Sequence, residues 1–281
     1  MRRWSALSRL TRKPKAGRVQ RVAGQVHVEV EESIGWIVLD QPERRNAISV
    51  EMWRAIPDAV LRLADDTAVR VVVLRGQGDT AFAAGADISE FESSRTGDNV
   101  AGYDDDSGRA IAALTGLRKP LIAMIHGFCI GGGCTVALTA DLRYAADDAR
   151  FAIPAARLGL GYAPGGIERL MALVGPSSAK ELFFTARRFS AHEALAMGLV
   201  NSVQEKTDLE RHVRSAARQI AANAPMTVAS VKLIVDELTK SADRRDHGAM
   251  AASVTECFDS DDYREGIRAF LEKRDPEFRG A

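Results

Sequence analysis

The sequence contains little cysteine and no long apolar run. Its three cysteines among 281 residues are Cys129, Cys134 and Cys257. They are odd in number and match no zinc-binding spacing, so they predict buried free thiols in a reducing compartment. No apolar run approaches the roughly 18 residues that a membrane span requires. The sequence therefore indicates a globular protein without a membrane span, and 46% hydrophobic and 27% charged residues fit that class.

Acidic residues are missing from the N-terminus. The first 21 residues carry eight of the 38 Arg and Lys residues and no Asp or Glu, which leaves 30 basic against 38 acidic side chains elsewhere. The acidic balance of the remainder argues against a nucleic-acid partner. Residues 1–22 are typical of a disordered basic tail on a bacterial, cytoplasmic protein. A mitochondrial transit peptide, with a location in the mitochondrial matrix, is the alternative.

Residues 119–135 are the stretch around which the chain is organised. Leu121 to Ile125 is an apolar run of strand length, three glycines follow at 131–133, and Cys134 to Leu142 has the composition of a buried helix. Glycines at such a turn expose backbone N–H groups at a helix N-terminus, which suits a phosphate, a carboxylate or a developing oxyanion. A turn or packing role for the triplet is the alternative.

A second corner of this kind follows another strand. Val71 to Leu74 is strongly β-forming, and Gly85-Ala86-Asp87 lies in a segment of small residues at 80–91. Two corners that each follow a strand can converge on one atom. The sequence therefore predicts one site built from both.

The segments that contain these two corners, together with three other motifs, resemble the crotonase (enoyl-CoA hydratase/isomerase) superfamily. The resemblance runs in order from about residue 25 to residue 279. It rests on LDQPERRNAIS at 39–49, AFAAGADISEF at 81–91, HGFCIGGGC at 126–134, RFSAHEALAMGLVN at 188–201 and EGIRAFLEKRDPEF at 265–278. Five motifs in one order are far more specific than any one alone.

The resemblance implies an α/β fold, a crotonase-type spiral of ββα units with a C-terminal helical region. We expect a basic extension at 1–22, a spiral core domain at 23–207 and a helical oligomerisation region at 208–281. The residues themselves predict a hairpin at 26–40, a helix from Ser49 to about Asp65, and strands near 142–146 and 150–153. The polar stretch between Phe91 and Arg109 predicts a mobile surface loop.

The resemblance places the family's oxyanion-hole amides on Ala86 and Gly132. These amides would hold the thioester oxygen of a coenzyme A substrate and stabilise its enolate. Coenzyme A would enter as part of the substrate, with no further cofactor and no metal. The implied class is a lyase or isomerase that acts on acyl-CoA.

The family's usual proton-transfer groups are replaced in this sequence. The two hydratase glutamates correspond to Thr135 and Ala155, and an aspartate of some family isomerases corresponds to Ala163. None of these side chains can act as a general acid or base, which puts ordinary water addition in doubt.

Tyr162 is the polar residue next to these positions. A family branch that decarboxylates methylmalonyl-CoA is similar here, so Tyr162 could orient a carboxylate or donate a proton. A half-buried core tyrosine is the alternative. A malonyl-type acyl-CoA decarboxylase and a non-catalytic acyl-CoA-binding protein are therefore the competing functions.

The resemblance also implies how coenzyme A is held. Arg44 or Arg45 would contact its phosphates, while Phe270 and Lys273 would reach the nucleotide end, often from a neighbouring subunit of a homotrimer or dimer of trimers. The backbone contacts would come from Ala47, Ala84, Asp87 and Ile88. From the residues alone, Asp87 is more simply a helix cap, and His126 is more simply a packed histidine than a base.

Overall fold

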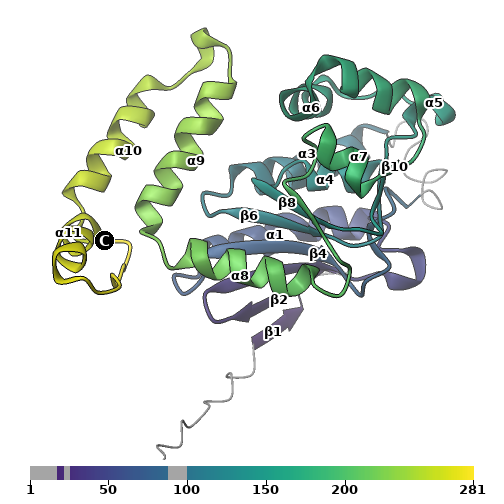
Figure 1. Cartoon of the computed structure of the whole chain (residues 1–281). Helices are drawn as coiled ribbons and strands as arrows, with labels where there is room; N and C mark the ends of the chain where they lie inside the picture. The colour runs from purple at the N-terminus through teal and green to yellow at the C-terminus, as the bar shows by residue number, and fades with distance from the viewer. Residues whose placement is uncertain (1–17, 22–25, 88–99) are drawn as a thin grey trace, which may run out of the picture.

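The computed structural model describes residues 18–21, 26–87 and 100–281, whose strands form two sheets (Figure 1). The larger sheet has the order β1-β2-β3-β4-β6-β8-β11, and the smaller has the order β10-β9-β7-β5. The strands are β1 (Arg18–Arg21), β2 (Val26–Glu31), β3 (Ile34–Leu39), β4 (Val71–Gly76), β5 (Ala81–Ala83), β6 (Leu121–Ile125), β7 (Phe128–Ile130), β8 (Leu142–Ala146), β9 (Arg150–Ala152), β10 (Phe189–Ser190) and β11 (Ser202–Gln204).

The helices follow the strands in a repeating order. Three times, a strand of the larger sheet is followed by a strand of the smaller sheet and then by a helix, as in β4-β5-α3, β6-β7-α4 and β8-β9-α5. The helices are α1 (Val50–Asp65), α3 (Val100–Gly116), α4 (Gly132–Ala137), α5 (Ala155–Leu158), α6 (Pro164–Thr185), α7 (Ala191–Ala196), α8 (Leu209–Ala221), α9 (Pro225–Thr239), α10 (His247–Asp259) and α11 (Asp261–Glu272), with 3-10 turns at Pro42–Arg44 and Ala242–Arg244. Each repeat therefore brings a strand-to-helix corner to the smaller sheet.

The larger sheet is covered on both faces. Every residue of β3 is buried, with Ile37 and Leu39 packed in one core cluster and Trp36 and Val38 in the other. A strand buried on both sides reads as a continuous apolar run, and β3 is such a run. The second cluster includes three residues of α8, namely Leu209, Val213 and Ala217. The helix α8 thus belongs to the core, although the sequence predicts a boundary at residue 208.

The predicted hairpin and first helix are confirmed. β2 and β3 pair antiparallel with Val26 opposite Leu39. Ser49 caps α1, because its hydroxyl accepts a hydrogen bond from the Met52 amide at 3.2 Å. The helix ends at Asp65 as expected.

Three other predictions need correction. The stretch expected as a loop between Phe91 and Arg109 is helical from Val100, and its earlier part lies outside the described residues. The helix expected from Cys134 to Leu142 begins at Gly132 and ends at Ala137, because Leu142 already belongs to β8. At the N-terminus, Arg18–Arg21 pairs with β2, so the disorder expected for residues 1–22 does not include this segment.

The last three helices extend from the core as an arm. Figure 1 shows α9, α10 and α11 on the opposite side of the molecule from α5 and α6. The hydroxyls of Ser230 and Ser253 join α9 to α10 at 2.9 Å, and the Arg70 side chain donates to the Phe278 carbonyl at 2.8 Å, which ties the C-terminal tail to the core. None of the helices described is long and apolar enough to cross a membrane.

Candidate active site

The two predicted corners meet beside the smaller sheet. Gly131 follows β7 with φ 51° and ψ −114°, a conformation that glycine adopts without a Cβ clash. Its amide donates to the Ala152 carbonyl at 2.8 Å, and the next residue, Gly132, begins α4. A Cβ on Gly132 would lie 3.3 Å from the amide nitrogen of Ala86. The two corners therefore lie in van der Waals reach of each other, as the sequence predicts.

The backbone on either side of Ala86 is fixed by Ile48. The Ile48 amide donates to the Gly85 carbonyl at 2.7 Å, and the Ile48 carbonyl accepts from the Asp87 amide at 3.1 Å. Within the described residues, the Ala86 amide has no hydrogen-bond acceptor. The Gly132 amide has none there either, because the first N–H groups of a helix lack intrahelical partners. Two unused donors thus lie at neighbouring corners.

A buried carboxylate holds the Ala86 corner in place. Asp87 is 6% exposed, and its Oδ2 accepts from Arg44 at 2.5 Å and from the Gln41 amide group at 3.5 Å. The sequence more simply predicts that Asp87 caps a helix. That helix would begin at residue 88, which lies outside the described residues. What the structure shows is an ion pair that joins the corner to the turn at Pro42–Arg44.

Thr135 and Tyr162 lie together next to the glycine turn. The Thr135 hydroxyl and the Tyr162 hydroxyl are 2.5 Å apart, and Thr135 also donates to the Gly131 carbonyl at 3.3 Å. The Tyr162 ring packs edge-on against Phe183 with 4.8 Å between centroids. Tyr162 is therefore held at both ends, by its ring and by its hydroxyl.

Ala155 is buried near the same turn. It begins α5 directly after Pro154, whose Cδ would lie 3.9 Å from a Cβ on Gly131. Ala163 is the residue before α6. The structure thus brings Thr135, Ala155 and Tyr162 around one turn, and none of them carries a carboxylate.

Comparisons with known proteins place this chain in a family. The model of the family described as Enoyl-CoA hydratase/isomerase matches residues 29–281. The chain belongs to this family. It is 34% identical over 251 residues to a crotonyl-CoA hydratase of Syntrophomonas wolfei, covering 89% of this chain and 96% of that protein. It is likewise 34% identical over 259 residues to a carnitinyl-CoA dehydratase of Proteus mirabilis, covering 91% and 98%.

Solved structures of the family confirm the fold. One described as an enoyl-CoA hydratase/carnithine racemase from Magnetospirillum magneticum matches with a TM-score of 0.89 and 31% identity, over 94% of this chain and 97% of that chain. A family protein from Hyphomonas neptunium matches with a TM-score of 0.85 and 38% identity, over 90% and 97%. The crotonase-type α/β fold with its C-terminal helices is therefore the fold of this chain.

The residues expected to hold coenzyme A fall into two groups. Ala47 and Ala84 lie beside the Ala86 corner, where the Ala84 amide donates to the Arg45 carbonyl at 3.0 Å. Phe270 and Lys273 lie in and just after α11, on the arm and away from this corner (Figure 1). Within one chain they do not join the site, so their role stays a prediction about a neighbouring subunit. Ile88 lies outside the described residues.

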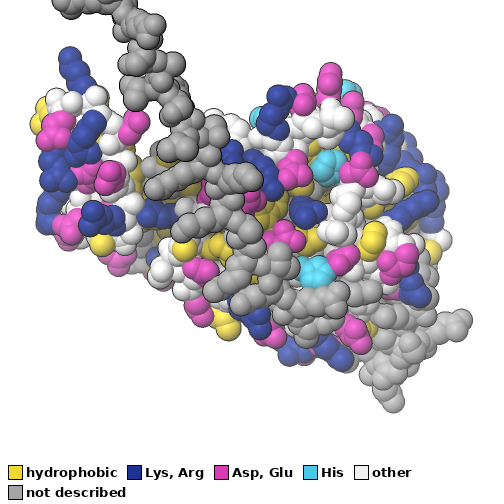
Figure 2. All heavy atoms as spheres, turned by 90° about the horizontal axis from the view of Figure 1, so that it is seen from below, with side chains coloured by type: hydrophobic (Ala, Val, Ile, Leu, Met, Phe, Trp, Pro, Cys, Tyr) yellow, Lys and Arg dark blue, Asp and Glu magenta, His cyan; other side chains and the backbone are white. Residues whose placement is uncertain are grey.

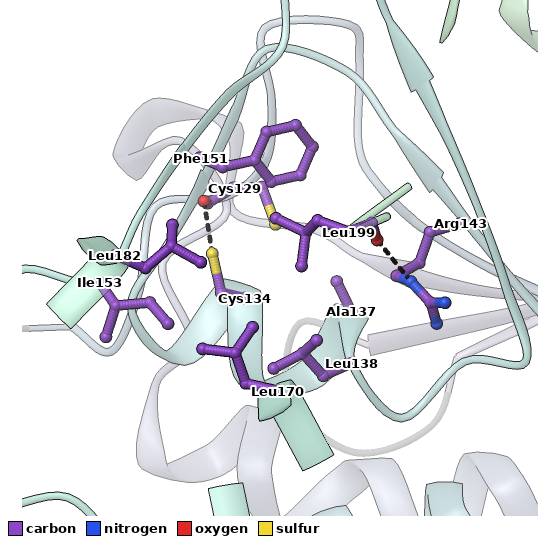
Figure 3. Close-up of a pocket in the computed structure, with 10 residues that line it drawn as sticks. All are labelled: Cys129, Cys134, Ala137, Leu138, Arg143, Phe151, Ile153, Leu170, Leu182 and Leu199. Atoms are coloured by element: carbon purple, nitrogen blue, oxygen red, sulfur yellow. Dashed lines mark hydrogen bonds between the residues drawn. The ribbon is translucent and has the colours of Figure 1, made fainter. Parts of the chain in front are cut away.

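The cysteines near the turn are structural. A cavity of about 10 Å³ lies beside the turn. Apolar side chains line it together with Cys129, Cys134 and Arg143 (Figure 3). This volume suits at most one water molecule. The Cys134 thiol donates to the Cys129 carbonyl at 2.8 Å, and burial raises the pKa of the Cys129 thiol. The prediction of buried free thiols is confirmed for this pair, whereas Cys257 is half-buried.

His126 is also a packed residue. It is 8% exposed, and burial lowers its pKa although Asp148 and Asp79 act in the opposite direction. Among the described residues, no three His, Cys, Asp or Glu side chains are grouped as a metal site. The prediction that His126 packs rather than acts as a base agrees with this burial.

One feature of the site region could not be predicted from the sequence. The side chains of Arg45 and Arg188 both lie over the ring of Phe128. Arg188 lies in the family motif at 188–201, but nothing in that motif indicates Phe128 as its neighbour. Only the pairing of β10, β9 and β7 brings these segments together.

Proposed function

We propose that this chain is an acyl-CoA lyase or isomerase that stabilises a thioester enolate with the backbone amides of Ala86 and Gly132. The observation that carries the proposal is the approach of the two corners, in which a Cβ on Gly132 would lie 3.3 Å from the Ala86 nitrogen. Preorganised amides at a developing oxyanion are a large source of catalysis, and one such donor is worth about 3 kcal/mol. The names of the relatives, a crotonyl-CoA hydratase and a carnitinyl-CoA dehydratase, support a coenzyme A thioester as the substrate.

The proton-transfer step has to differ from that of a hydratase with two glutamates. Thr135 and Ala155 cannot exchange a proton with water or with the α-carbon at neutral pH. The Tyr162 hydroxyl is the one polar group among the predicted catalytic positions, and its bond to Thr135 orients it. We assign Tyr162 the task of orienting the substrate or donating a proton to it.

The Thr135–Tyr162 contact keeps decarboxylation as a second candidate. Loss of carbon dioxide from a malonyl-type thioester needs an electron sink rather than a base, and two amides can provide that sink. The names of the relatives do not favour this reaction or a non-catalytic acyl-CoA-binding role. Decarboxylation and the non-catalytic binding role therefore stay predictions.

Turnover of a panel of thioesters tests the proposal. We expect reaction with at least one enoyl-CoA, 3-hydroxyacyl-CoA or malonyl-type CoA thioester, and a loss of at least about 10-fold in Tyr162→Phe if the hydroxyl takes part. Binding of acyl-CoA without any turnover would favour the non-catalytic role. No detectable binding of acetyl-CoA or longer acyl-CoA at millimolar concentration would contradict the site assignment.

The proposal also covers the oligomeric state, the location in the cell and the partners. We infer a homotrimer or a dimer of trimers in the cytoplasm, with coenzyme A present only as part of the substrate; the bacterial origin of the relatives supports the location. On the face shown in Figure 2, basic and acidic side chains are interspersed over the described surface, which does not favour a nucleic-acid partner.

A further inference from the structure

A cavity lies where the arm meets the core, apart from the two corners. Its volume of about 310 Å³ is at the small end of the range for ligand-binding cavities. Its walls come from the residues that precede β4 and β6, from the junction of α8 and α9, from α10 and from the C-terminal tail. Because the two corners follow β5 and β7, the cavity lies at the opposite ends of β4 and β6.

Positive charge predominates around this cavity. Among the described residues that line it, four are cations and one, Glu256, is a carboxylate; the cations are Arg70, Arg118, Lys119 and Arg279. No carboxylate in the described part of the chain forms an ion pair with any of the three arginines. A cleft lined by charges of one sign attracts ligands of the opposite sign. The lining therefore favours an anion.

The arginines have unused hydrogen-bond donors. Arg70 donates through one Nη to the Phe278 carbonyl at 2.8 Å, and a guanidinium carries five N–H groups. Arg118 and Arg279 are exposed, and within the described residues their side chains donate to no acceptor. Lys119 differs, because its ammonium donates to two carbonyls at the end of α1, at 2.6 and 2.8 Å. The arginines are thus the groups that can hold an anion.

The uncharged part of the lining is mainly apolar. Its larger apolar side chains are Val69, Pro120, Ile220, Met226, Val228 and Leu233. Two of its hydroxyls, those of Ser230 and Ser253, are bonded to each other at 2.9 Å. Apolar walls with a few charged groups suit a ligand that has an apolar body and one anionic group.

The cavity lies on a different side of α9 from the exposed apolar surface of the arm. Met226, Ser230 and Leu233 line the cavity, whereas Val231 and Val235 are more than half exposed. At 3.6 residues per turn, these two sets are about half a turn apart around the helix. An assembly that covers Val231 and Val235 therefore acts on the opposite side of α9 from the cavity.

We propose that this cavity binds a small carboxylate with a short aliphatic chain, of the size of hexanoate. The carboxylate accepts charge-assisted hydrogen bonds from the arginines, and the chain lies against the apolar side chains of the wall. Since Arg118 belongs to the core and Arg279 to the tail of the arm, the ligand joins the two parts. The site is separate from the thioester site and does not depend on the proposed function.

A titration followed by ligand-observed NMR, with hexanoate as the probe, tests the site. We expect the wild type to bind hexanoate with a Kd of about 1 mM or lower, which is within reach of a ligand of this size. Hexanol has the same chain without the charge, and acetate has the charge without the chain. Each should bind at least about 10-fold more weakly than hexanoate.

Three variants and one control locate the binding. Arg118→Gln and Arg279→Gln each remove one guanidinium from the lining and should weaken hexanoate binding by roughly 10-fold. Ala229→Phe fills the cavity from α9 and should abolish binding while it keeps every arginine. Lys180→Gln removes the same charge from α6, on the opposite side of the molecule from the arm (Figure 1), and should leave the affinity unchanged. Thermal melting shows whether each variant is folded.

Three results would overturn the proposal. The first is the absence of hexanoate binding by the wild type. The second is equal affinity in the wild type, Arg118→Gln and Arg279→Gln, which would place hexanoate elsewhere; these two exposed positions decide the question even if Ala229→Phe does not fold. The third is tighter binding of inorganic phosphate than of hexanoate, because it would show that the apolar walls contribute nothing.

Discussion

The three glycines of the turn differ in what each position requires. Gly131 has φ 51°, which strains any residue with a Cβ. Gly132 faces the Ala86 amide, and Gly133 could not carry a Cβ at all, because that atom would lie 2.3 Å from the Ala83 carbonyl oxygen. The triplet is evident in the sequence, but these separate roles are not, because they depend on residues 83–86, which are about 50 residues away in the chain.

Substitution at Gly132 should affect activity more than stability. In Gly132→Val, the Cβ would lie 3.3 Å from the Ala86 nitrogen and the two methyl groups would fill the space in front of it. We expect kcat/KM to fall by about 10²–10³-fold or more, as for the loss of one oxyanion donor, with weaker acyl-CoA binding and a folded protein. Steady-state kinetics and thermal melting check both parts.

Gly133→Ala is the matched comparison. Its Cβ would overlap backbone, so we expect a loss of about 1–3 kcal/mol in the free energy of unfolding. Wild-type turnover in Gly132→Val would show that the triplet serves packing alone.

Restoring the missing carboxylates should create or raise hydratase activity. Thr135 and Ala155 are small, and Thr135 already contacts the Tyr162 hydroxyl, which could donate to a glutamate in its place. Because a positioned acid or base contributes about 10²–10⁴-fold, the double variant Thr135→Glu with Ala155→Glu should hydrate crotonyl-CoA well above the parent rate.

The two single variants and thermal melting are the controls for that experiment. Two like charges in a confined site raise the pKa of one carboxyl and lower stability, so rate and melting temperature have to be compared in the same proteins. Hydration of crotonyl-CoA by the parent at about 10 s⁻¹ or faster would refute the claim that Thr135 and Ala155 leave it without an acid and a base.

Among the elements, those with simple patterns were predictable and α3 was not. The hairpin and α1 follow from alternation and from the Ser49 cap, both of which are local. The turn-rich composition of 92–108 predicts a loop, yet Tyr103 and Asp106 are buried in α3, where Arg54 donates to Asp106 at 2.7 Å. A buried carboxylate satisfied by a distant arginine is a tertiary effect, and local propensity cannot reveal it.

The cap of α7 gives a prediction about acid stability. Glu193 accepts hydrogen bonds from the Ser190 amide at 2.8 Å and from Arg187 at 2.7 Å, which together lower its pKa from the ordinary 4.5 to about 2. A carboxylate with a lowered pKa in the folded state stabilises the protein above pH 4.5, and this contribution is lost as the pH falls toward 2.

Thermal melting of Glu193→Gln against pH tests the cap. The variant should melt below the wild type at pH 7, and the difference should shrink between pH 4.5 and pH 2 as Glu193 of the wild type becomes protonated. A difference that stays constant across this range would show that the ionised form of Glu193 contributes nothing.

At the scale of the whole molecule, the arm has an exposed apolar surface. Phe270 is 83% and Leu271 is 74% exposed, and further apolar side chains on α9 and α10, including Val231, Val235 and Phe258, are more than half exposed. Apolar surface of this kind marks an interaction site in a protein of ordinary composition. The helical pattern of the C-terminus could be read from the sequence, but which faces lack a partner within the chain required the structure.

Introducing charged side chains into this exposed apolar surface should therefore weaken the assembly of subunits. We expect wild-type protein to have a mass that is a multiple of the 30.4 kDa chain, and Phe270→Glu with Leu271→Glu to shift it toward single chains, because buried carboxylates are costly at an interface. Sedimentation velocity measures both. A wild-type mass of one chain would contradict the predicted trimer.

The central claim is that the amides of Ala86 and Gly132 hold the oxygen of a thioester. A crystal structure with bound butyryl-CoA measures this directly. The account predicts the thioester oxygen within about 2.7–3.2 Å of both nitrogens, the range of an N–H···O hydrogen bond. A bound thioester whose oxygen contacts neither amide would contradict it.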